Sequence, residues 1–190
     1  MNHAPTLGMP ERRMMEGERI TTRILEEARQ ALAGVGAQEA QDFIAALAAA
    51  PEIFVTGQGR SGLMVSAFAV RLAQLGKPAH IVGSPTTPAV GSGGMLVACS
   101  GSGRTRSTLL HAEQALAAGA QVWAITQAPS SPLFSAATRT IVIPSLPTMQ
   151  PGGSAFEQAL LIFLDAMVVG LMAALGETED RMLARHANLE

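Results

Sequence analysis

Short apolar runs alternate along this chain with longer stretches in which apolar residues recur every three or four positions. The runs are typical of strands and the stretches of amphipathic helices. Strands that read as continuous apolar runs belong to parallel sheets covered by helices on both faces. The pattern therefore predicts an α/β fold, a doubly wound five-stranded parallel sheet flanked by helices, with strands at 53–55, 79–82, 95–99, 121–126 and 140–143.

Helix ends are marked by threonine caps, by glycines and by prolines. We expect helices from Thr21 or Thr22 to 33, over 37–50, from the first glycine loop to 75, over 105–118, within 128–137, over 154–175 and over 178–185. Residues 1–18 are expected to form a flexible N-terminal segment, and 19–190 a single domain. The Gly- and Pro-rich stretch 83–94 is expected to be a loop.

Two small-residue loops follow the first and third strands, GQGRSG at 57–62 and SGSGRTRS at 100–107. In the flavodoxin-like order 2-1-3-4-5 these strands are neighbours, and ligands bind where their carboxyl ends meet. The hydroxyls of Ser100, Ser102 and Thr105 can face one small anion at a helix N-terminus, and Arg60 adds a fixed charge suited to phosphate. The alternative is that these glycines serve only tight strand-to-helix turns, which need no ligand.

Several classes of protein are disfavoured by the same residues. The spacing of Gly57, Gly59 and Gly62 fits a dinucleotide fingerprint, but no acidic residue ends the second strand, and no GxxxxGK[ST] loop is present. The net charge of -2 argues against nucleic-acid binding. The lone Cys99 builds no metal cluster, suits the core and fits a cytoplasmic location. We expect no membrane span, because the apolar stretch 159–175 contains Asp165 and the chain starts without an apolar leader. We also expect no metal and no cofactor.

With these loops, the stretches QPGGSAFEQ (150–158) and RHANLE (185–190) make the chain resemble the 6-phospho-3-hexuloisomerase family, which belongs to the wider sugar-isomerase (SIS) domain group. The resemblance extends from Thr22 to the end of the chain. It implies an isomerase that interconverts D-arabino-3-hexulose 6-phosphate and D-fructose 6-phosphate without a metal, in the ribulose monophosphate pathway of formaldehyde fixation. Family members are commonly homotetramers with sites near subunit interfaces.

The resemblance also implies roles for particular residues. Ser100, Ser102 and Thr105 would hold the phosphate, Arg60 and Ser61 would line the site, and Glu157 and His186 would perform acid–base chemistry, with base and acid unassigned. From the residues alone, Glu157 could instead complete a capping box with Ser154, and His186 could simply be solvated. Ser84 and Gly94 depart from the family pattern and leave the contacts of loop 83–94 open.

Other functions are compatible with the same loops. One is an aldose–ketose isomerase acting on another sugar phosphate, and one is a non-catalytic SIS module that senses a sugar phosphate. His80 and His111 are interpreted as a strand-end and a helix-surface residue. The very apolar helix 154–175 and the two N-terminal helices are expected to pack against other subunits.

Overall fold

The computed structural model describes residues 9–188, and it describes side chains from residue 19 onward. A five-stranded sheet lies at its centre, in the order β2-β1-β3-β4-β5, and every neighbouring pair is parallel. The strands are β1 (Ile53–Gly57), β2 (Ala79–Ile81), β3 (Met95–Cys99), β4 (Gln121–Thr126) and β5 (Arg139–Val142). The predicted α/β fold and strand order are confirmed, with strand ends shifted by one or two residues.

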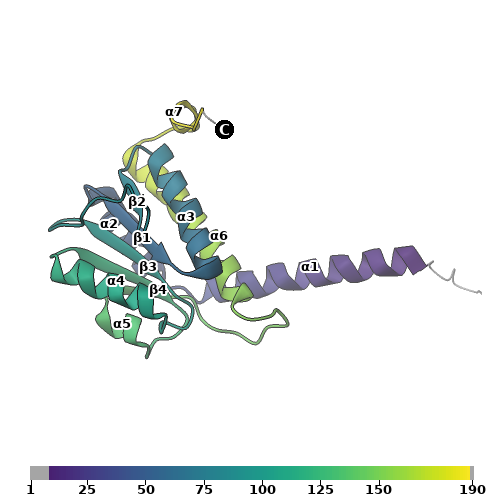
Figure 1. The fold of residues 1–190 in the computed structure, drawn as a ribbon. Helices are drawn as coiled ribbons and strands as arrows, with labels where there is room; N and C mark the ends of the chain where they lie inside the picture. Colours follow the sequence, from purple (N-terminus) through teal and green to yellow (C-terminus); the bar gives the residue numbers. More distant parts are fainter. Residues whose placement is uncertain (1–8, 189–190) are drawn as a thin grey trace, which may run out of the picture.

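Helices cover both faces of the sheet (Figure 1). On one face lie α2 (Ala37–Ala49), α3 (Gly59–Gln74), α6 (Ser154–Leu175) and the end of α1 (Met9–Ala33). On the other lie α4 (Arg106–Ala117) and α5 (Pro132–Ala136), and the short α7 (Glu179–Ala184) follows α6. Alternate residues of the central strands enter the two cores, so that Val97 faces α3 and α6 while Leu96 faces α4.

Cys99 is fully buried at the end of β3, as its apolar surroundings predict. Burial raises the pKa of its thiol well above the usual range, because a thiolate would lose its hydration there. The residue is therefore a core side chain rather than a nucleophile.

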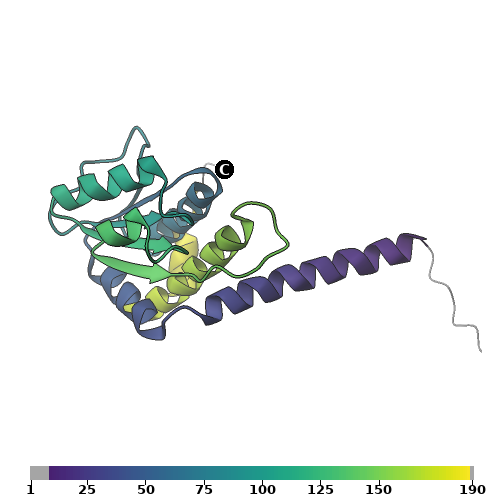
Figure 2. The same ribbon diagram turned by 90° about the horizontal axis from the view of Figure 1, so that it is seen from below.

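The first helix differs most from the expectation. Instead of starting at Thr21 or Thr22, α1 begins at Met9 and projects away from the domain as a straight arm (Figure 2). Its last turns reach the core through Ala28 and Ala31. The residues expected to be flexible thus include helical ones, and the flexibility of 1–18 itself stays a prediction.

Among the described residues, one helix, α6, is long and apolar enough to cross a membrane by length and composition alone. A core helix of a soluble protein passes the same test. In this fold α6 packs against α3, α2 and α1 and buries Leu160, Leu164 and Leu171.

Candidate active site

The β3–α4 loop holds two of the three predicted hydroxyls together. The hydroxyl of Ser100 lies 3.0 Å from that of Thr105 and accepts a hydrogen bond from the backbone N–H of Gly103 at 3.1 Å. Ser100 is buried, whereas Ser102 lies on the exposed rim and accepts from the N–H of Arg104. Thr105 is the N-cap residue of α4, so the loop opens directly onto a helix N-terminus. Such an arrangement is suited to a small anion.

The end of β4 and the helix α5 hold this loop in place by donating hydrogen bonds to its backbone carbonyls. Gly101 accepts hydrogen bonds at its carbonyl from the hydroxyl of Thr126 and the N–H of Gln127. The carbonyl of Gly103 accepts from the N–H of Leu133, the first buried residue of α5. Strand and helix neighbours therefore hold the loop shape together with bonds inside the loop, such as that from Gly103 to Ser100.

Arg60 and Glu157 form an ion pair between the first turns of α3 and α6. The Nε of Arg60 donates to Oε2 of Glu157, whose side chain is 13% exposed against 59% for Arg60. Ser61, the next residue of α3, is buried. The strand–helix turn before it is tight, because a Cβ on Gly62 would lie 2.9 Å from the carbonyl oxygen of Gly57.

Phe156 connects this ion pair to the Ser/Thr loop. Its ring packs so closely on Gly101 that a Cβ there would lie 3.0 Å from the ring. The start of α6 is thereby held beside the β3–α4 loop. At the carboxyl edge of the sheet, the structure thus places five predicted site residues near Glu157: Arg60, Ser61, Ser100, Ser102 and Thr105.

The capping-box interpretation of Glu157 is wrong. The N-cap of α6 is Gly153 rather than Ser154, and it makes no side-chain cap bond. The carboxylate of Glu157 instead turns to Arg60, 97 positions away in the sequence.

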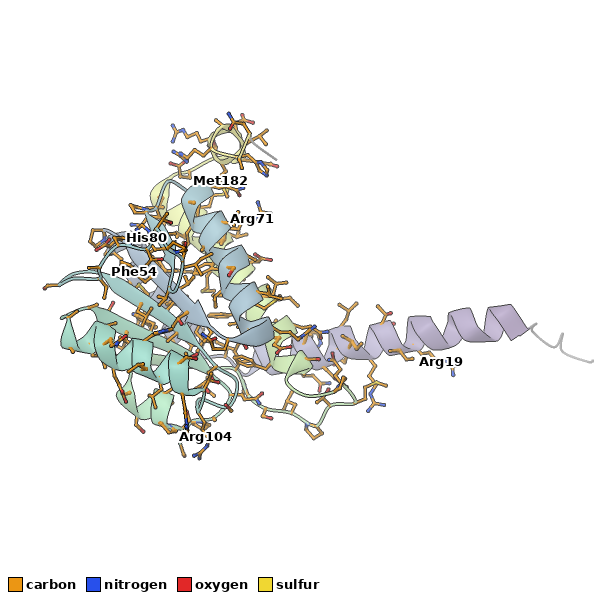
Figure 3. All side chains as sticks on the ribbon, viewed as in Figure 1. Arg19, Phe54, Arg71, His80, Arg104 and Met182 are labelled. Carbon is orange, nitrogen blue, oxygen red and sulfur yellow. The ribbon has the colours of Figure 1, made fainter. Side chains whose placement is uncertain are left out.

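His186 is not part of this cluster within one chain. It follows α7, where its Nδ1 lies 3.1 Å from the carbonyl of Ala187 and its ring is exposed. It lines a cavity of about 240 Å³ together with Arg71, Gln74, Met172, Glu179, Met182 and Leu183. From Glu157 to the end of α6 at Leu175 the chain rises by 18 residues, about 27 Å at 1.5 Å per residue. Figure 3 shows Arg71 and Met182 at the end of the molecule opposite Arg104 of the Ser/Thr loop.

His111 is not a helix-surface residue, and that interpretation is corrected. Its Nδ1 lies 2.8 Å from the hydroxyl of the buried Thr56, near the carboxyl end of β1. The half-buried ring ties α4 to the strand that leads into the first glycine loop. His80 lies in β2, with its ring 5.1 Å from that of Phe54 and its Nε2 3.9 Å from Glu52 (Figure 3).

Glu27 of α1 holds the loop that precedes α6. Its carboxylate accepts hydrogen bonds from the hydroxyl of Thr148, the N–H of Met149 and the amide of Gln150. These bonds lower the pKa of Glu27, because they favour its charged form. The sequence carried no signal for this contact, which joins residues more than a hundred positions apart.

No group of three or more His, Cys, Asp or Glu side chains in the described part of the chain gathers as metal ligands would. The cluster therefore offers hydroxyls, backbone N–H groups, one guanidinium and one carboxylate. These groups can bind a phosphate ester and move a proton near it.

Comparison with known proteins identifies the class of this fold. The SIS domain model matches residues 46–174, so the chain belongs to the SIS-domain proteins. It is 37% identical over 185 residues to the 3-hexulose-6-phosphate isomerase of Bacillus subtilis, covering 93% of this chain and 100% of the relative. It is 38% identical over 146 residues to the enzyme of the same name from Mycobacterium gastri, covering 73% of each.

A solved structure agrees with these relatives. The Methanococcus jannaschii protein MJ1247, whose crystal structure was taken to imply a 3-hexulose-6-phosphate isomerase function, superimposes with a TM-score of 0.81 at 30% identity, covering 92% of this chain and 99% of that one. The chain therefore belongs to the 3-hexulose-6-phosphate isomerase family.

Proposed function

We propose that this protein interconverts D-arabino-3-hexulose 6-phosphate and D-fructose 6-phosphate. The observation that carries the proposal is the Arg60–Glu157 pair beside the Ser/Thr loop, because it sets a proton-transfer group next to an anion site. The relatives named for this reaction favour it over another sugar-phosphate isomerase or a non-catalytic sensing module.

The phosphate occupies the β3–α4 loop in this proposal. Ser100, Ser102 and Thr105 donate their hydroxyls to its oxygens, and the N-terminus of α4 contributes partial positive charge. Arg60 and Ser61 lie on the opposite wall, where the sugar hydroxyls extend toward Glu157. Binding requires the hydroxyl that donates in the Ser100–Thr105 hydrogen bond to turn its proton toward the ligand.

The reaction moves a carbonyl from C3 to C2 through a 2,3-enediol. A base removes the C2 proton, the electrons of that bond form the C2–C3 double bond, and the C3 oxygen takes a proton. In the collapse of the enediol the C2 oxygen gives up its proton, C3 gains one, and the carbonyl is left at C2. Glu157 and His186 share these transfers, which a carboxylate and an imidazole can perform without a metal or cofactor.

We further propose that His186 reaches the site from another subunit of a homotetramer. The proposal rests on the length of α6, which keeps His186 away from Glu157 of its own chain. In this proposal the enzyme is a soluble cytoplasmic assembly that acts in the ribulose monophosphate pathway and has no nucleic-acid or membrane partners.

The direct test supplies hexulose phosphate made enzymatically from formaldehyde and ribulose 5-phosphate, and measures fructose 6-phosphate with a coupled dehydrogenase. We expect turnover that persists with chelator. We expect Glu157→Gln to lose at least about a hundredfold in kcat, because acid–base groups contribute on that scale. Glu113→Gln, an exposed carboxylate on α4, is the matched control. An assembled protein without turnover would disprove the proposal.

Shared sites are tested by mixing. Glu157→Gln and His186→Gln chains are each inactive in this proposal, but co-refolded they form mixed pairs with one intact site. Random pairing restores about a quarter of the wild-type rate when each site uses residues of two chains. Mixtures that stay inactive would place both residues in one chain's site.

A further inference from the structure

Arg185 fastens the C-terminal tail to the end of α3. Its Nη1 donates to the carbonyl of Gln74 at 3.0 Å, and its two terminal nitrogens donate to both carboxylate oxygens of Glu177 at 3.1 and 3.2 Å. The guanidinium also lies over Gly76, where a Cβ would come within 3.2 Å of its central carbon. One side chain thus joins the ends of α3, α6 and α7.

The partners of Arg185 are themselves fixed. Glu177 donates its backbone N–H to the carbonyl of Met172 in the last turn of α6. Gln74 is buried and receives a hydrogen bond from Arg71 on its side-chain oxygen. The carbonyl of Gln74 lies at a helix C-terminus, where partial negative charge favours a cation. The anchor is therefore built on two rigid helices.

Little else holds this part of the chain. No residue of α7 is buried, and its one core-facing apolar side chain, Met182, is only half-buried. The guanidinium of Arg181, one turn earlier, donates to the carbonyl of Gly176, close by in the sequence. Arg185 is accordingly the principal polar tie between the tail and the body of the domain.

We propose that Arg185 is a positioning residue, which sets the place of the neighbouring His186 imidazole for catalysis. The inference rests on the proposed function, in which His186 takes part in proton transfer. Arg185 points inward to α3 while His186, the next residue, is exposed at the rim of the cavity there. The anchored guanidinium fixes the backbone from which the imidazole extends toward a second copy of the chain.

The geometry of the anchor calls for arginine. The planar fork matches both oxygens of a carboxylate, whereas a lysine offers one point charge. Arg185 also lowers the pKa of Glu177, as expected for a carboxylate that it pairs with through two hydrogen bonds.

The test compares Arg185→Met, Arg185→Lys and the control Arg181→Met in the assembled enzyme. We expect Arg185→Met to lose on the order of a hundredfold in kcat, because small misplacements of a reacting group have effects of that size. KM should stay near wild type, since the phosphate loop is untouched. Arg185→Lys should retain an intermediate rate and Arg181→Met the full rate. Amide hydrogen exchange over 179–188 should accelerate in Arg185→Met.

Sedimentation confirms that each variant assembles, and Arg185→Lys carries the test if Arg185→Met does not. Full kcat in the assembled Arg185 variant, or an equal loss in Arg181→Met, would overturn the inference. His186→Gln separates the two proposals. If it is inactive while Arg185→Met is fully active, only the positioning role is wrong. If it is fully active, the role of His186 is wrong and the inference falls with it.

Discussion

Thr108 carries a buried hydroxyl that has no hydrogen-bond partner within the described part of the chain. It lies in the first turn of α4 and is fully buried. Leaving such a group unpaired costs about 1–3 kcal/mol. Thr126, by contrast, donates to Gly101 and accepts from the N–H of Ala128. These two buried threonines therefore differ in hydrogen bonding: the hydroxyl of Thr126 has two partners, and that of Thr108 has none within the described part of the chain.

Thr108→Val should raise the free energy of unfolding by about 1 kcal/mol, since valine keeps the shape and removes the unpaired hydroxyl. Thr126→Val should lower it by about 1–3 kcal/mol, because the N–H of Ala128 loses its acceptor and the carbonyl of Gly101 loses one of its two donors. Urea denaturation measures both. Equal destabilisation by the two substitutions would show that the hydroxyl of Thr108 is satisfied in solution.

At the scale of elements, the β3–α4 loop depends on one left-handed glycine. Gly103 has φ +59°, and a Cβ there would overlap the side chain of Ser131. Gly152 has the same φ but open space around its Cβ position. Alanine substitutions at the two positions therefore separate the cost of backbone strain, which both share, from the cost of a steric clash, which only Gly103 has.

Gly152→Ala should lower stability by about 1 kcal/mol, the strain of an L residue in this region. Gly103→Ala should lower stability by more, because Ser131 must also move, and should raise KM for the sugar phosphate. Denaturation curves and steady-state kinetics test this. Similar losses at the two positions would mean that the loop accommodates the methyl group freely.

The hydrogen bonds from the loop before α6 to Glu27 of α1 predict that the free energy of unfolding depends on pH. The folded pKa of Glu27 is lowered from 4.5, so its contribution is complete above that value and is lost as pH falls through the folded pKa. Glu27→Gln should therefore destabilise the protein at neutral pH, with a difference from wild type that shrinks on acidification. Unfolding free energies measured across pH test it, with Glu113→Gln as control. A difference independent of pH would exclude the carboxylate as the cause.

At the scale of the whole molecule, α3 and α6 together expose an apolar surface. Leu63 and Val70 on α3 and Ile162 and Val169 on α6 are 43–68% exposed. Each pair is seven positions apart, which keeps both members on one side of their helix. The two helices pack against each other, and we expect these exposed side chains to contact a second copy of the chain.

Val169→Asp should dissociate the assembly, because a carboxylate is expensive to bury in an apolar contact. Activity should fall with it, since Glu157 and His186 lie at opposite ends of α6. Leu110→Asp on α4, on the other face of the sheet, should leave both unchanged. Sedimentation velocity and the coupled assay measure the two effects. A dissociated variant with full turnover would rule out sites shared between chains.

The sequence by itself determined the strands, their order, the long helix 154–175 and the loops that carry the hydroxyls. These follow from local patterns: continuous apolar runs, three- and four-residue periodicity, and small residues after two neighbouring strands. The start of α1 was not predicted, because residues 9–18 are rich in methionine, proline and charge, a composition typical of a chain end without regular structure.

Only the tertiary structure decided which side chains meet. Arg60 and Glu157 pair across 97 positions, and His111 reaches Thr56 across 55. Such contacts depend on how helices pack on the sheet, which no local pattern encodes. The same packing places Glu157 in the first turn of α6 and His186 beyond its last turn. The two residues of the proposed site therefore do not meet within one chain. The reason is geometric, because α6 is rigid and joins the two ends at a fixed separation.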